Sequence, residues 1–102
     1  MNNLIIEATK TAVEEIKKII EKQNADDKAI RINISGFGWG GPQLGLVLDE
    51  QKDSDYVKEI NGVTFVAGED MKHYDGFNIE YANSFLRKGF VVSIKGMPAS
   101  SC

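Results

Sequence analysis

Residues 35–42 read Ser-Gly-Phe-Gly-Trp-Gly-Gly-Pro, and this glycine stretch separates two apolar runs that we expect to be neighbouring strands. Glycine is used where the backbone needs a positive φ or where another group approaches it closely, and each glycine costs about 0.5–1 kcal/mol relative to alanine. Four glycines in eight residues, with Phe37 and Trp39 between them, predict a shaped loop that presents a binding surface.

The runs on either side of the glycine stretch alternate with a period of two, which is typical of half-buried strands. We therefore expect one strand from Ala29 to the start of the stretch and a second from Gln43 to Asp49. Loops that cradle phosphate lead into the N-terminus of a helix. Because a strand follows here, the sequence excludes a nucleotide loop. The alternating apolar residues are Ile30, Ile32, Ile34, Leu44, Leu46 and Leu48.

The N-terminal quarter of the chain predicts a short strand, Leu4–Ile6, followed by one amphipathic helix. The helix should begin at Thr9 or Thr11 and end near Gln23, with Thr11 and Glu14 as a capping box. Its apolar stripe faces a core, and its opposite face is solvated. The stripe consists of Ala12, Val13, Ile16, Ile19 and Ile20.

The dipeptide Asn61-Gly62 predicts a β-hairpin between Tyr56–Ile60 and Val63–Ala67. A two-residue type I′ turn needs positive φ at both central positions, which Asn-Gly supplies. This hairpin is the strongest local structural signal in the chain.

The remaining third of the chain predicts a short helix and two more strands. Residues 69–75 look like a helical turn or a short helix, closed by Gly76 as a C-terminal stop. Strands are expected at Phe77–Tyr81 and Gly89–Ile94. The tail from Gly96 to Cys102 has little apolar content and should be mobile when nothing binds it.

Two polar features of the sequence are candidate sites. Asp49–Asp55 contains four acidic residues, but its spacing does not match an EF-hand loop, which favours a solvated acidic turn over a calcium site. His73 is the only histidine and has no neighbouring cysteine or second histidine in sequence, so we interpret it as a surface or half-buried side chain. No other residues form a catalytic pattern, and the chain is not expected to be an enzyme.

Length and composition indicate one domain over residues 1–102 with a single core. The net charge is −3 and the pI is near 5.1, with no basic run, which argues against nucleic acid and anionic membranes as partners. No apolar segment suits a signal peptide or a membrane span, so we expect a cytoplasmic protein. The one cysteine, Cys102, allows no disulfide within the chain.

The order of these motifs resembles the HesB/IscA family of A-type iron-sulfur carriers. The resemblance rests on one helix, a Gly-x-Gly-Gly stretch leading into Leu44–Glu50, then Asn61-Gly62, Asp75-Gly76 and Lys88-Gly89-Phe90. It runs over nearly the whole chain. It implies a HesB-like α+β fold, in which one N-terminal amphipathic helix packs against small mixed β-sheets, and it implies a homodimer or tetramer.

The resemblance also implies a metal site. Members of this family are similar in carrying three cysteines, one in a Gly-Cys-x-Gly loop and two near the C-terminus, which bind iron or a [2Fe-2S] cluster between subunits. Here the loop reads Gly38-Trp39-Gly40-Gly41, so Trp39 stands where the loop cysteine is expected, and Cys102 is the remaining candidate ligand.

Two functions follow as hypotheses. The first is an accessory protein of iron-sulfur cluster assembly, which holds iron or a [2Fe-2S] cluster through Cys102, or holds no metal, and which contacts assembly proteins or apo-acceptor proteins. The alternative is a protein-binding module without metal, in which Phe37, Gly38, Trp39, Gly40 and Gly41 present an aromatic binding loop. Equally, both rings could fold back into the core.

Overall fold

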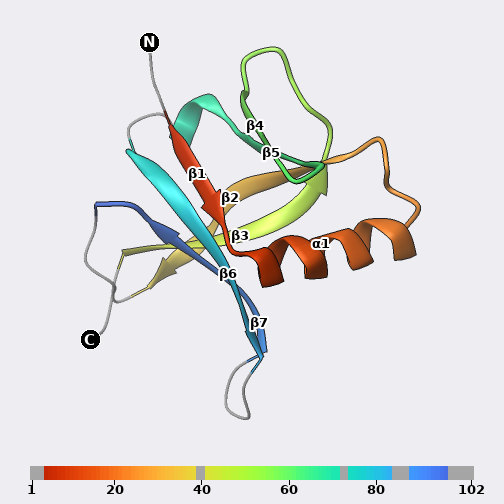
Figure 1. Ribbon diagram of the computed structural model, residues 1–102. Helices are drawn as coiled ribbons and strands as arrows, with labels where there is room; N and C mark the ends of the chain where they lie inside the picture. The colour runs from red at the N-terminus through yellow and green to blue at the C-terminus, as the bar shows by residue number, and fades with distance from the viewer. Residues whose placement is uncertain (1–3, 39–40, 72–73, 84–87, 97–102) are drawn as a thin grey trace.

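The computed structural model describes residues 4–38, 41–71, 74–83 and 88–96, with side chains at all of these except 35–38, 41–43, 83 and 88. Figure 1 shows one helix beside crossing β-strands, and the strands form two sheets. Both sheets contain parallel and antiparallel pairs. In the described part of the chain, the expected α+β class with small mixed sheets is therefore confirmed.

The first sheet joins the two ends of the described chain. It consists of β1 (Ile5–Ala8), β6 (Gly76–Asn83) and β7 (Lys88–Ile94), in the order β1-β6-β7. β1 runs parallel to β6, and β7 runs antiparallel to it. β1 begins and ends later than the expected Leu4–Ile6, and both later strands extend beyond their expected limits.

The second sheet is built from two hairpins. It consists of β2 (Ala29–Gly38), β3 (Gly41–Asp49), β4 (Tyr56–Ile60) and β5 (Val63–Ala67), in the order β3-β2-β5-β4. Parallel pairing of β2 with β5 joins the hairpins. The sequence predicted both hairpins, and the β4–β5 hairpin has the expected limits.

The helix α1 (Lys10–Lys22) begins one residue after Thr9, whose side chain is its N-cap. The Thr9 Oγ1 accepts a hydrogen bond from Ala12 N at 3.2 Å, which satisfies one of the free N–H groups of the first turn. The capping box predicted at Thr11 was therefore wrong, because the helix starts two residues earlier than that motif requires. The expected start at Thr9 and end near Gln23 are confirmed.

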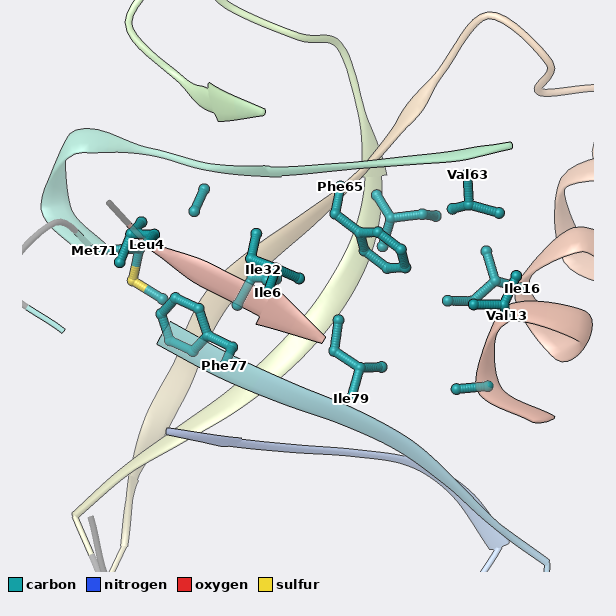
Figure 2. Close-up of a cluster of buried hydrophobic side chains, with 13 residues drawn as sticks. Leu4, Ile6, Val13, Ile16, Ile32, Val63, Phe65, Met71, Phe77 and Ile79 are labelled. Atoms are coloured by element: carbon teal, nitrogen blue, oxygen red, sulfur yellow. The ribbon is translucent and has the colours of Figure 1, made fainter. Parts of the chain in front are cut away.

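One cluster of buried apolar side chains lies between the two sheets and α1 (Figure 2). Phe65 of β5 and Phe77 of β6 are fully buried in it, while Val13 and Ile16 reach it from α1 near Val63. Full burial of such a side chain stabilises the fold by about 1.5–3 kcal/mol. The cluster therefore holds the sheets and the helix together as one core.

Gly76 does not stop a helix, and this prediction was wrong. The segment before it contains a short 3-10 turn, η1 (Glu69–Met71), which agrees with the helical turn expected there, but Gly76 is the first residue of β6. A Cβ atom at Gly76 would lie 2.1 Å from the carbonyl oxygen of Ile5. Glycine is needed here because the backbone of Ile5, in the neighbouring parallel strand β1, approaches it closely.

No helix in the described part of the chain is long and apolar enough to span a membrane. His73 and most of the expected mobile tail, residues 97–102, lie outside the described residues. Gly96 is described and follows β7 in a turn with φ of 83°. The single domain over residues 1–102 stays a prediction.

Candidate metal and binding site

The glycine stretch forms the end of the β2–β3 hairpin rather than a free loop of eight residues. Phe37 pairs with Pro42 and Gly38 pairs with Gly41, so only residues 39 and 40 connect the strands. The register shifts between Ile34 and Gly36, which leaves a bulge in β2. The predicted loop limits were therefore wrong, because most glycines of the stretch take part in the pairing of the two strands. A bulge accommodates the extra residue in β2.

The predicted site residues are only partly described. The backbones of Phe37, Gly38 and Gly41 belong to the strands, whereas Trp39, Gly40 and Cys102 lie outside the described residues. The side chains at 35–38 are also outside the description. The aromatic loop and the thiol ligand therefore stay predictions.

The β2–β3 hairpin lies beside β7, the last strand of the described chain. β3 packs against β7, and Figure 1 shows the glycine end of β2–β3 on the same side as the C-terminal end of β7. The chain leaves β7 from a fixed point, since Lys95 N donates a 2.8 Å hydrogen bond to Gly76 O. The Lys95 side chain also pairs with Glu7 of β1. The C-terminal end of β7 therefore lies on the side of the molecule that carries the glycine stretch.

A polar cluster lies at the other end of the β2–β3 hairpin, where Arg31 binds two aspartates. Its Nη1 and Nη2 donate to the two carboxylate oxygens of Asp55 at 3.0 and 2.7 Å, and its Nε donates to Asp49 Oδ2 at 2.6 Å. Nη2 also donates to the backbone oxygen of Glu50 at 3.0 Å. We call these three side chains, Arg31, Asp49 and Asp55, the arginine clamp.

Charge pairing in the arginine clamp changes the acidity of both carboxyl groups. The Asp55 side chain is only 2% exposed, and its pKa is lowered mainly by the hydrogen bonds from Arg31. The pKa of Asp49 is lowered by its hydrogen bond from the backbone of Glu50 and then by Arg31. The two carboxylates in turn raise the pKa of Arg31. All three groups therefore stay charged near neutral pH.

The arginine clamp engages two of the four acidic residues of the turn Asp49–Asp55. Asp49 and Asp55 already share the charge of Arg31, and the Lys52 backbone N–H also donates to Asp55. Among the described residues no three His, Cys, Asp or Glu side chains are placed to hold a metal ion. The turn is held to the sheet by an arginine. Residues 50–54 are exposed, as the sequence predicted, and the buried carboxylate is that of Asp55.

The alternation of Ile30 and Ile32 implies that Arg31 lies on the opposite face of its strand, but it gives no sign of the partners of Arg31. Those partners lie 18 and 24 residues further along the chain, so no local spacing marks them. A lone arginine between isoleucines, followed by an acidic turn, is the one signal that could have suggested the pairing.

Comparison with known proteins places this chain in a family. No family model matches it. It is 31% identical over 90 residues to a protein of Aquifex aeolicus, with 86% of this chain and 78% of that protein covered. It is 30% identical over 86 residues to the iron-sulfur cluster insertion protein ErpA of Xylella fastidiosa, with 82% and 67% covered.

Solved structures show the same fold. SufA of Escherichia coli superposes with a TM-score of 0.75 at 19% identity over 95% of this chain and 85% of SufA. IscA with a [2Fe-2S] cluster gives 0.74 at 19% identity, covering 89% and 86%. A protein of Aquifex aeolicus gives 0.69 at 28% identity, covering 91% and 94%. Fold and sequence together define a HesB-like domain. The chain belongs to the HesB/IscA family of A-type iron-sulfur carriers, which includes ErpA.

Proposed function

We propose that this chain is an accessory protein of iron-sulfur cluster assembly that carries its cargo without catalysing a reaction. The observation that carries the proposal is the 30% identity to an iron-sulfur cluster insertion protein over 82% of the chain. The shared fold with IscA and SufA supports it. No catalytic pattern in the sequence competes with a carrier function.

The donor set of the chain favours weak binding of iron or of a [2Fe-2S] cluster. Cluster iron is normally held by soft thiolates, and the indole of Trp39 is a hydrogen-bond donor only. The glycine stretch therefore supplies no thiolate, and Cys102 is the one thiol of the sequence. In this proposal two subunits each contribute Cys102, and serine, water or glutathione completes the coordination of the iron. Such a site should hold iron more weakly than one with three thiolates per subunit.

The partners follow from this cargo. We infer a homodimer or tetramer, because one thiol per chain cannot complete a cluster. We infer transient contacts with other assembly proteins or apo-acceptor proteins, which deliver or receive the iron. We also infer a cytoplasmic location. The net charge of −3 and the absence of a basic run in the sequence argue against nucleic acid or an anionic membrane as the partner.

The test is anaerobic reconstitution of the purified chain with iron and sulfide. The proposal predicts a visible charge-transfer band for the wild type and its loss in Cys102→Ser. Ser101→Ala is the matched control, because it changes a neighbouring side chain and leaves the thiol in place. Equal absorption by wild type and Cys102→Ser, with no band in either, would overturn the metal-binding part of the proposal.

A further inference from the structure

We propose that Asn61 and Gly62 form a site of self-modification, at which the backbone nitrogen of Gly62 attacks the Asn61 side chain and converts its amide to a carboxylate. These two residues make up the whole β4–β5 turn, since Ile60 pairs with Val63. Both are exposed, with φ of 49° and 89°. The site is independent of the proposed iron-binding function.

The attacking nitrogen and the attacked amide are both free. Neither the Gly62 N–H nor the Asn61 carboxamide has a hydrogen-bond partner within the residues that the structure describes. Gly62 also lacks a side chain that would hinder approach. Ring closure needs a local opening of the turn, and exposed turns open at low free-energy cost.

The reaction balances with water as its only co-reactant. The Gly62 nitrogen forms a bond to Cγ of Asn61, the bond from Cγ to Nδ2 breaks, and ammonia leaves with the proton that the Gly62 nitrogen gives up. Water then opens the resulting succinimide. Attack at Cγ gives aspartate, and attack at the backbone carbonyl carbon gives isoaspartate. Nothing is oxidised or reduced.

Lys17 of α1 lies beside this turn and favours the reaction. A Cβ atom at Gly62 would lie 3.9 Å from Cε and 4.0 Å from Nζ of Lys17. A positive charge at this position stabilises the negative charge that develops on the nitrogen and on the carboxamide oxygen. Lys17 has no ion-pair partner among the described residues, so its charge is available for this purpose.

The product changes a hollow on the protein surface. Asn61 lines a hollow of about 540 Å³ together with Lys10, Val13, Glu14 and Lys17 of α1. Conversion of the neutral amide to a carboxylate adds a negative charge beside two lysines. The modification therefore changes the charge of the surface between α1 and the β4–β5 turn.

Asn24 provides a control inside the same chain. It is also exposed and has a positive φ of 53°. However, the next backbone nitrogen, that of Ala25, donates a 2.9 Å hydrogen bond to Ile20 O, and Ala25 is buried. The nucleophile at this asparagine is therefore occupied in the folded protein.

The experiment compares both asparagines in the folded chain and in peptides of the same local sequence. Samples are incubated at mildly alkaline pH and mapped by mass spectrometry, where each conversion adds about 1 Da. We expect folding to slow the reaction at Asn24 at least about tenfold more than at Asn61, because only Asn24 is followed by a bonded nitrogen. Equal protection of both sites, or stronger protection of Asn61, would overturn the proposal.

Two variants test the part played by Lys17. Lys17→Gln is expected to slow conversion of Asn61 about threefold, the size of effect that one nearby exposed charge produces. Lys18→Gln is the matched control, because Lys18 pairs with Glu15 and does not line the hollow. An equal rate in Lys17→Gln and Lys18→Gln would show that the Lys17 charge does not assist the reaction.

Discussion

Arg31 connects three parts of the second sheet through one guanidinium group. It lies on β2 and binds Asp49 at the end of β3 and Asp55 just before β4. The Arg31 side chain is 14% exposed and that of Asp55 is 2% exposed, so this contact is largely removed from water. Breaking such a pair leaves one charge without a partner, which costs more than the pair itself contributes.

Replacing Arg31 with methionine should therefore destabilise the fold. We expect Arg31→Met to lower the free energy of unfolding by about 3 kcal/mol, because Asp55 stays buried without its partner. Urea denaturation measures this change. The matched control is Lys28→Met, which breaks the solvent-exposed pair with Glu50 and should have little effect. Similar losses in both variants would contradict a special role for the arginine clamp.

The arginine clamp should also make stability depend on pH. The pKa of Asp55 is lowered in the folded state, so the unfolded chain binds the proton more readily. The contribution to stability is present above the unfolded pKa of about 4 and is lost as the pH falls through the lower folded value. Urea denaturation across this acid range should show a smaller pH dependence for Asp55→Asn than for the wild type. An unchanged pH dependence would contradict the assignment.

Trp39 marks the position at which the family resemblance places a thiolate. If that register is right, Trp39→Cys should increase the iron bound after anaerobic reconstitution, because it adds a soft ligand to each subunit. Phe37→Cys, two positions away on β2, is the matched control and should add less. No gain in Trp39→Cys, or an equal gain in both, would contradict the register. Iron content and visible absorption provide the measurement.

At the scale of elements, contacts between strands determine which residue a position needs, and the local sequence does not reveal these contacts. Gly76 begins β6 and pairs with Ile5 of the parallel strand β1, whose backbone lies close to it. We expect Gly76→Ala to lower the free energy of unfolding by about 3 kcal/mol, since the added methyl group forces β1 away from β6. In contrast, a Cβ atom at Gly89 meets no atom within 4 Å, and only its φ of 132° opposes substitution.

Gly89→Ala is therefore the comparison for Gly76→Ala, and it should cost about 1 kcal/mol through backbone strain alone. Urea denaturation of both variants measures the difference. A larger loss in Gly89→Ala than in Gly76→Ala would contradict the close approach of β1 to β6.

These elements also show what the sequence can and cannot predict. Asn61-Gly62 correctly predicted the β4–β5 hairpin, because the turn depends only on the conformations of those two residues. Gly76 was assigned to a helix end, because its true neighbour, Ile5, is 71 positions earlier in the chain. The glycine stretch was expected to be a loop, since glycine gives no local sign that a ladder continues through it.

At the scale of the whole molecule, the apolar periodicity predicted one helix and several strands, and the family resemblance implied their α+β class. The buried faces of β2 and α1 include Ile30, Ile32, Val13 and Ile16, as expected from periodicity. Ile19, which was expected on the apolar stripe of α1, is 40% exposed instead. The arrangement of strands in two sheets came from the family resemblance. The resemblance could not supply the arginine clamp, because that clamp depends on distant contacts of this chain.

The central claim is that this HesB/IscA family member carries iron or a [2Fe-2S] cluster through Cys102. The most direct measurement is the iron and sulfide content of the chain purified without exposure to air, compared between wild type and Cys102→Ser. Iron in the wild type and its loss in Cys102→Ser are the expected result. Equal iron content in both proteins, or none in either, would contradict the claim.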